Sequence, residues 1–209
     1  MSSILETAEN LKRELEALDE KGLDLLFRNG RSHNGWQPHE VSGRLLRRLW
    51  ELVRYAPTAV NGMPARLVFV TTPDGKKRLE PCLSPGNVEK VMSAPVTVII
   101  GYDIAFWQHL PKLFPHADVR EMFSENFEVA ELTAFRNSSL QGAWLMLAAR
   151  ALGLDCGPMS GFDGERLDQA FFAGTTIRSN FLCNVGYGDP SKLYPRLPRL
   201  SFEEACAFA

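Results

Sequence analysis

The chain has 209 residues, of which 45% are apolar, and its formal net charge is -2. This length allows one good hydrophobic core, and no segment approaches the ~18 consecutive apolar residues of a membrane span. The charge balance leaves no basic surface of the kind that binds nucleic acid. We therefore expect one domain over residues 1–209, with neither nucleic acid nor a membrane as a partner.

Cysteine and histidine spacing argues against a metal site. The four cysteines are far apart and form no C-x-x-C pair: Cys82, Cys156, Cys183 and Cys206. This excludes zinc-knuckle and thioredoxin-like motifs. His109 and His116 have no carboxylate or thiol nearby at ligand spacing. The first residues are rich in glutamate and lack the apolar core of a signal peptide. We expect a cytoplasmic protein with buried or inert thiols and no bound metal.

Hydrophobic periodicity predicts the main elements. Long helices are expected over residues 3–27, 41–55 and 128–152. Strands are expected over residues 66–72, 96–101 and 180–186. Shorter helices are expected over 76–82, over 163–172 and after Ser201, which forms a capping-box pattern with Glu204. Turns or breaks are expected at 72–75 and 84–87. The aromatic, irregular stretch 103–127 has the content of a lid or pocket wall.

The helix predicted over 128–152 carries a polar patch in its middle. The patch consists of Arg136, Asn137, Ser138, Ser139 and Gln141. Because buried polar groups need partners, we expect this patch to face a subunit interface or a ligand.

Four breaks rich in hydrogen-bond donors or in glycine and proline adjoin firm elements. They lie at residues 31–34, 56–66, 157–163 and 192–199. The first could bind an anion or be a solvated loop with Ser32 as a helix cap, and the second could be a turn or one wall of a site. The Walker A, G-x-G-x-x-G and G-x-S-x-G patterns are all absent. The residues alone thus indicate an α+β domain with a planar, anionic ligand.

In this order the breaks resemble the FMN-dependent nitroreductase family. The family motif Ala-Pro-Ser-x-x-Asn-x-Gln-Pro-Trp is similar to residues 56–65, Ala-Pro-Thr-Ala-Val-Asn-Gly-Met-Pro-Ala. The family's N-terminal Arg/Ser loop is similar to 31–34, its flavin-edge loop to 158–162, and its C-terminal Ser-Arg-Leu-Pro to 195–198. Two positions depart from the motif: Met63 stands where the family has Gln, and Ala65 where it has Trp.

A narrower resemblance is to the malonic semialdehyde reductase branch, which serves the Rut pathway of pyrimidine degradation. Four stretches carry it, at residues 31–36, 135–139, 157–163 and 196–204. The resemblance implies an α/β sandwich with a central, mostly antiparallel sheet flanked by helices. It also implies an intertwined homodimer with FMN at the interface. The implied reaction is ping-pong hydride transfer, from NADH or NADPH to flavin N5 and then to an aldehyde.

The resemblance also implies which residues bind the cofactor, while no side chain acts as nucleophile. These residues are Arg31, Ser32, His33, Asn61, Met63, Pro158, Met159, Ser160, Gly161, Arg196 and Arg199. Asn61 could reach the flavin of the partner subunit. Arg66 and Arg136 are candidates for holding a substrate carboxylate, although a dimer salt bridge is an equal alternative for Arg136. The assignment of Arg31, Ser32 and His33 to phosphate or ring is open, as is the role of 103–127 as a lid.

Two other functions remain compatible with the same motifs. A general nitroreductase or quinone reductase would share every FMN residue. A non-catalytic flavin-binding protein would use the donor-rich loops without turnover. The sequence does not distinguish NADH from NADPH, because it contains no Rossmann acid that could do so.

Overall fold

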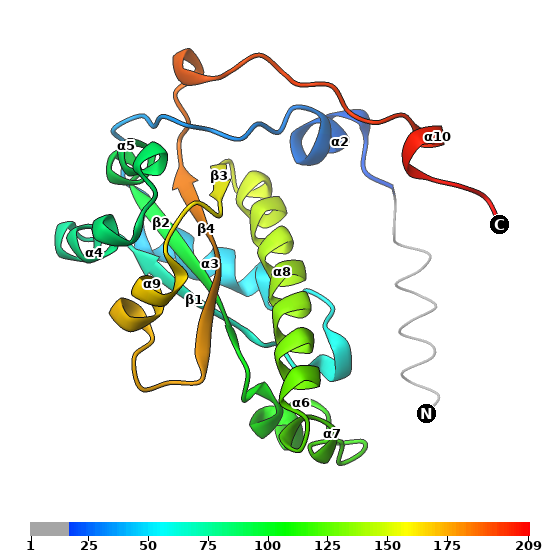
Figure 1. Ribbon diagram of the computed structural model, residues 1–209. Coiled ribbons are helices and arrows are strands. Elements are labelled where there is room, and N and C mark those ends of the chain that lie inside the picture. The colour runs from blue at the N-terminus through cyan, green and yellow to red at the C-terminus, as the bar shows by residue number, and fades with distance from the viewer. Residues whose placement is uncertain (1–16) are drawn as a thin grey trace.

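A computed structural model describes residues 17–209 and centres on a four-stranded sheet (Figure 1). The strands are β1 (Ala65–Val70), β2 (Val96–Asp103), β3 (Asp155–Met159) and β4 (Ile177–Gly186), in the spatial order β1-β2-β4-β3. Every neighbouring pair is antiparallel. This confirms the predicted α+β architecture with an antiparallel central sheet.

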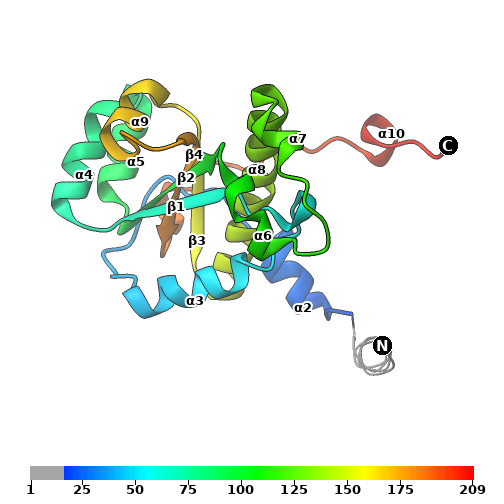
Figure 2. The same ribbon diagram turned by 90° about the horizontal axis from the view of Figure 1, so that it is seen from below.

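Helices cover both faces of the sheet (Figures 1 and 2). On one face lie α3 (Gly43–Val53) and the long α8 (Phe127–Ala151), and on the other lie α4 (Pro73–Leu79), α5 (Pro85–Ser93) and α9 (Gly164–Phe171). Short helices complete the chain: α2 (Glu20–Leu23), α6 (Leu110–Leu113), α7 (Glu121–Ser124) and α10 (Phe202–Ala205).

The alternation of side chains along β2 explains the two cores. All eight residues of β2 are buried. Val98 and Ile100 join the core under α3 and α8, whereas Ile99 points to the core under α4, α5 and α9. Because successive strand side chains point to opposite faces, a continuous apolar run suits a strand covered on both sides.

Helix capping explains where the sequence prediction of 72–75 and 84–87 was wrong. Thr72 caps α4 by accepting a hydrogen bond from the Gly75 amide at 3.1 Å, so Pro73 begins a helix rather than a turn. Pro85 likewise begins a helix, α5, with Ser84 at the N-cap position. The Ser84 side chain forms no capping hydrogen bond. Proline is favoured in the first helical turn, where no amide partner is required.

The stretch predicted as a glycine- and proline-rich break at 157–163 contains most of β3. Pro158 pairs with Cys183 of β4, although it cannot donate to a ladder. Proline is tolerated there because β3 is an edge strand. The segment 103–127 is also more regular than expected, since it holds α6, α7 and a 3₁₀ turn at Phe106–His109.

Most other element predictions are confirmed within a few residues. The predicted helices at 41–55 and 128–152 match α3 and α8, and the capping box of Ser201 and Glu204 begins α10. The first 14 residues of the predicted helix at 3–27 lie outside the described residues. The remainder holds α2 and a π-helical turn at Asp24–Arg28.

The described thiols differ in exposure. Cys82, Cys156 and Cys183 are buried, whereas Cys206 is exposed. A hydrogen bond with the Cys156 thiol, together with burial, raises the pKa of Cys183. A thiol with a raised pKa is a poor nucleophile. The expected inertness therefore has a physical basis at Cys183.

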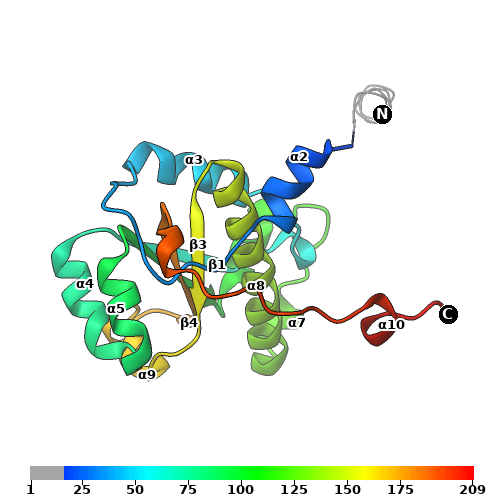
Figure 3. The same ribbon diagram turned by 90° about the horizontal axis from the view of Figure 1, so that it is seen from above.

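The chain ends in a C-terminal arm, residues 193–209, that runs away from the sheet and its helices (Figure 3). Apolar side chains on the arm are mostly open to solvent, including Leu197 at 73% and Leu200 at 70% exposure. Within the described chain, no other element packs over these apolar side chains of the arm.

Candidate functional site

The N-terminal loop at 31–33 lies along the edge of β3. The His33 amide donates a hydrogen bond to the Cys156 carbonyl at 2.9 Å, and Ser32 forms a parallel bridge with Cys156. Glycine is required on the facing backbone, because a Cβ at Gly157 would come within 2.4 Å of the His33 carbonyl oxygen. The predicted residues 31–33 are thus fixed beside the strand that leads to 158–161.

The His33 side chain is buried in this edge, with 7% exposure. Its Nε2 lies 3.4 Å from Oδ1 of Asp155, whose Oδ2 accepts from the Gly188 amide at 2.9 Å. Within residues 17–209 its Nδ1 has no hydrogen-bond partner. This side of the ring packs on the backbone of Gly188, where a Cβ would lie 1.9 Å from Nδ1, so glycine is needed at that position.

Arg31 links this edge to the start of the C-terminal arm by donating a hydrogen bond to the carbonyl of Tyr194. Farther along the arm, Arg196 and Arg199 are exposed. The Arg199 guanidinium donates to the carbonyls of Leu197 and Pro198, both at 3.0 Å. The Arg31 side chain is therefore fixed by a hydrogen bond to the start of the arm. Arg196 and Arg199 lie farther along the arm.

The predicted flavin-edge residues follow at the other end of β3. Pro158 and Met159 end the strand, and Ser160 and Gly161 come directly after it. The Gly161 carbonyl accepts hydrogen bonds from the Ser84 amide at 3.1 Å and from Asn87 Nδ2 at 2.9 Å. A Cβ at Gly161 would lie 2.5 Å from Asn87 Nδ2, so a larger residue there would displace the Asn87 amide from this bond.

Asn87 is a residue that the sequence interpretation missed. It holds the 158–161 loop from the first turn of α5. The available signal was Ser84 followed by Pro85, which is a usual helix start. Interpreting that pair as a break hid the helix and, with it, the role of Asn87.

The segment 56–66 lies elsewhere on the sheet and has an unusual backbone. Val60, Asn61 and Met63 have φ values of 49°, 51° and 42°. This left-handed conformation costs about 1–2 kcal/mol for a residue with a Cβ. The Asn61 side chain donates to the Leu113 carbonyl at 2.8 Å, so it is committed to the 103–127 segment within this chain.

The two arginines proposed for substrate differ in their surroundings. Arg66 donates to Asp103 Oδ2 at 2.7 Å and to the carbonyls of Met63 and Ala65 at 3.0 and 3.1 Å. Arg136 is exposed on α8, and no ion pair involves it within residues 17–209. Arg136 therefore has the more available guanidinium.

Three residues of the polar patch of α8 bond within the chain, whereas the sequence predicted that the patch faces a subunit interface or a ligand. Asn137, Ser138 and Gln141 are buried. They bond to the Ala59 amide, to Asn180 and to the Ala65 amide, respectively. Asn180 is available because the β2–β4 register shifts between Ile100 and Gly101. The expectation of an interface or ligand was wrong for these three residues.

The sheet register separates the predicted residues into two groups. Met159 pairs with Leu182, Leu182 with Ile99, and Ile99 with Val68, so β3 and β1 form opposite edges. Three strand spacings amount to about 14 Å. Residues 31–33 and 158–161, which we call the β3-edge site, share one edge. Asn61, Met63 and Arg66 lie toward the far corner.

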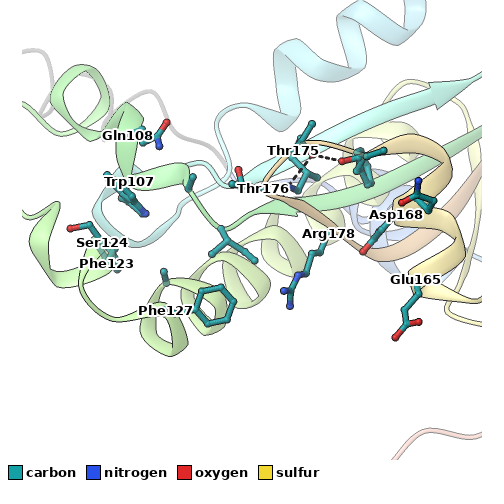
Figure 4. A pocket seen from close by; sticks show the side chains of 17 residues that line it. Trp107, Gln108, Phe123, Ser124, Phe127, Glu165, Asp168, Thr175, Thr176 and Arg178 are labelled. Carbon is teal, nitrogen blue, oxygen red and sulfur yellow. Dashed lines mark hydrogen bonds between the residues drawn. The ribbon is translucent and has the colours of Figure 1, made fainter.

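A cavity of about 910 Å³ contains none of the predicted cofactor residues. Its walls come from 104–130 on one side and from α9 and the start of β4 on the other (Figure 4). Trp107, Phe123 and Phe127 form its aromatic side, and Arg178, which pairs with Glu131 at 2.5 Å, stands beside Phe127. The 103–127 segment therefore does form a pocket wall, as its composition predicted.

A second cavity, of about 470 Å³, adjoins the two positions that depart from the family motif. Met63, Ala65 and Arg66 line it together with His109 and Leu113 of the 103–127 segment. The small Ala65 side chain leaves part of this space open. Cavities of this size accommodate small ligands.

Residues 17–209 contain neither a metal-binding cluster nor a helix suited to cross a membrane. There, no three His, Cys, Asp or Glu side chains are grouped so that they could hold a metal ion. No helix within residues 17–209 has the length and apolar character needed to cross a membrane.

Comparison with known proteins agrees with this architecture. A model of the nitroreductase family matches residues 28–187. A Burkholderia lata protein with the provisional name NADH dehydrogenase/NAD(P)H nitroreductase is 60% identical over 190 residues, covering 91% of this chain and 97% of that protein.

Two solved structures share the fold. One, provisionally named a nitroreductase, is from Bacillus subtilis, with a TM-score of 0.82 and 21% identity over 91% of this chain and 100% of that one. The other, also provisionally named, is a nitroreductase in complex with FMN from Exiguobacterium sibiricum, with a TM-score of 0.81 and 20% identity over 93% and 99%. The family match and the 60% identical relative together show that the chain belongs to the nitroreductase family.

Proposed function

We propose that the protein is an FMN-dependent NAD(P)H oxidoreductase. The observation that carries this proposal is the β3-edge site, where the donor-rich residues 31–33 lie beside the strand that leads to residues 158–161. The family membership and the FMN bound to the Exiguobacterium structure support the same cofactor. The relative named NAD(P)H nitroreductase supports the reductant.

The two ends of the β3-edge site suit the two ends of FMN. Residues 31–33 stand beside Cys156 and residues 158–161 end the strand, so about four rises of 3.3 Å separate them. In our assignment Arg31, Ser32 and His33 hold the phosphate end, with Arg196 added from an arm. The amides of Ser160 and Gly161 face the ring edge, where charge changes during reduction. When bound, FMN supplies the hydride chemistry.

We further propose that two chains complete each site. Asn61 and Met63 lie at the far corner of the sheet from the β3-edge site, so in this assignment they serve the flavin of a partner subunit. The exposed arm carrying Arg196 and Arg199 has the reach of an element that embraces a second copy. A homodimer with FMN at its interface follows.

The proposed substrate is malonic semialdehyde, reduced to 3-hydroxypropionate in pyrimidine degradation. The support is the set of four short motifs at 31–36, 135–139, 157–163 and 196–204. This substrate carries a carboxylate, and an unpaired arginine is the usual partner for one. Arg136 fits that role better than Arg66, which is already bonded to Asp103.

A general nitroreductase or quinone reductase is the second candidate, and the name of the 60% identical relative favours it. Steady-state kinetics with NADH and with NADPH distinguish the two substrates. We expect kcat/KM for malonic semialdehyde to exceed that for a nitroaromatic such as nitrofurazone. Brisk nitroreduction beside negligible turnover of the semialdehyde would reverse this choice. Purified protein that is colourless and takes up no FMN would contradict both candidates.

A further inference from the structure

The backbone between Ala59 and Ala65 is held in a conformation that its sequence does not favour. Val60, Asn61 and Met63 all have positive φ values, between 42° and 51°, although none is glycine. A β-branched residue such as Val60 rarely adopts this region. Such geometry persists only where surrounding contacts determine it.

Two side chains of α8 supply those contacts at the two ends of the segment. Asn137 Oδ1 accepts a hydrogen bond from the Ala59 amide at 2.8 Å. Gln141 Oε1 accepts one from the Ala65 amide at 2.9 Å. Residues four apart lie on one face of a helix, so the helix fixes the distance between the two acceptors. The ends of the strained segment are thereby fixed as well.

Gln141 is fully buried, and within residues 17–209 its bond to the Ala65 amide is the one hydrogen bond that its side chain makes. Its Nε2 has no partner in this part of the chain. Burying an amide with an unpaired donor is unfavourable, and an apolar side chain of the same size would avoid that loss. The hydrogen bond to the Ala65 amide is therefore the contact that accounts for a polar side chain at position 141.

We propose that Asn137 and Gln141 are positioning residues that clamp residues 59–65 in the shape required by the flavin of the partner subunit. Neither acts on the flavin directly; each acts through the backbone that carries Asn61 and Met63. This inference rests on the proposed function, because it assigns those two residues to an FMN site.

The test compares two substitutions of Gln141 with one control. Gln141→Glu keeps an acceptor oxygen and, as the neutral acid that burial favours, replaces the unpartnered NH₂ group by a single O–H. Gln141→Met keeps the length and loses the acceptor. Ser138→Ala removes another fully buried polar group of α8, one that contacts Asn180 rather than the 59–65 segment.

Two quantities are measured for each variant. The first is hydrogen exchange of the Ala65 amide in the protein freed of FMN, and the second is the FMN dissociation constant from flavin fluorescence. We expect Gln141→Met to raise both at least tenfold. Gln141→Glu and Ser138→Ala should keep both within threefold of the unsubstituted protein.

Several results would overturn the inference. Unchanged Ala65 exchange in Gln141→Met would show that no clamp exists. Faster exchange with unchanged FMN affinity would show that the clamp has no part in binding. Equal losses in Gln141→Met and Ser138→Ala would show general loosening of α8. If the unsubstituted protein bound no FMN, the proposed function and the flavin role would both fail, while the exchange comparison would still judge the clamp.

Discussion

At the scale of single residues, Arg136 and Arg66 show how surroundings decide which charge can serve a substrate. Arg66 is 28% exposed at its side chain and is bonded to Asp103 at 2.7 Å. Its charge is therefore compensated within the chain. Arg136 is exposed and lies one residue before Asn137, which holds the segment carrying Asn61. Only Arg136 combines an available guanidinium with a connection to the proposed flavin wall.

The Arg136→Gln variant should therefore lose affinity for a carboxylate substrate selectively. We expect KM for malonic semialdehyde to rise about tenfold, equivalent to about 1.4 kcal/mol of lost binding. KM for an uncharged nitroaromatic should change less than twofold. Arg66→Gln is not a suitable control because it unpairs Asp103, so Arg48→Gln serves instead, since Arg48 is exposed on α3 and forms no ion pair within residues 17–209. Equal changes for both substrates would remove Arg136 from substrate recognition.

Lys76 is a second residue whose burial has a measurable consequence. It is 7% exposed, and its Nζ donates to Thr97 Oγ1 at 2.6 Å and to the Val91 carbonyl at 2.7 Å. Desolvation lowers the pKa of Lys76 from 10.5 to about 8. Between these two values the folded protein binds fewer protons than the unfolded chain. The free energy of unfolding therefore rises with pH in that window.

The comparison of the unsubstituted protein with Lys76→Met isolates this effect from other titrating groups. From pH 7 to pH 9.5, the difference in unfolding free energy should move in favour of the unsubstituted protein by about 2 kcal/mol. Urea unfolding at both pH values gives the numbers. A difference that stays constant with pH would mean that Lys76 keeps an ordinary pKa.

At the scale of elements, the sequence predicts best where local rules and packing agree. Hydrophobic periodicity over 128–152 identifies α8, and the capping box of Ser201 and Glu204 identifies α10. It predicts β3 poorly because Gly157 and Pro158 suggest a break, whereas the pairing with β4 holds the strand. The amides of Ala59 and Ala65, at the two ends of the segment with positive φ, likewise bond to Asn137 and Gln141, which lie 78 and 76 positions away. Tertiary contacts of this kind leave no local pattern.

In the candidate site, too, features with a local sequence pattern were predicted and features set by tertiary contacts were missed. The sequence placed residues 31–33 and 158–161 among the cofactor contacts, and the structure brings both to one edge of β3. It missed Asn87, which reaches Gly161 only because α5 packs against the end of β3. Proximity across the sheet is a property of the strand order, which the sequence did not supply.

The outer face of α8 is the element most suited to join two chains. Four apolar side chains on it are between 40% and 54% exposed: Leu132, Phe135, Leu140 and Trp144. Large exposed apolar patches usually mark association surfaces. Arg136 already lies on this face, one turn from Leu132 and from Leu140, so a second arginine at position 140 would add a like charge that association would have to bury.

Leu140→Arg should therefore convert a dimer into monomers. Sedimentation equilibrium at micromolar protein measures the mass directly. Met92→Arg is the matched control, because Met92 is 37% exposed on α5, on the far side of the sheet from α8. We expect the control to remain dimeric. Dimers of both variants, or monomers of the unsubstituted protein, would contradict association through α8.

At the scale of the whole molecule, a single chain leaves the predicted cofactor residues in three places. The β3-edge site occupies one edge of the sheet, Asn61 and Met63 lie toward the far corner, and the arm carries Arg196 and Arg199 away from both. One chain cannot bring these together without large rearrangement. Two copies can, if each arm lies across its neighbour and each 59–65 segment meets the neighbour's β3 edge.

The arm permits a last prediction about phosphate binding. The Arg199 guanidinium donates hydrogen bonds to the Leu197 and Pro198 carbonyls of its own arm. The guanidinium of Arg196 has no partner within residues 17–209. An uncommitted guanidinium is the better phosphate ligand, because binding need not break an existing bond. Arg196→Ala should therefore weaken FMN retention at least tenfold, and Arg199→Ala less than threefold.

Ultrafiltration followed by flavin absorbance of the retained protein gives the comparison under one condition for both variants. Raising the salt concentration should reduce FMN retention in Arg199→Ala and in the unsubstituted protein more than in Arg196→Ala, because the screened ion pair is already missing there. Equal loss of FMN from the two variants would show that the arm contributes to the fold of the dimer rather than a phosphate contact through Arg196.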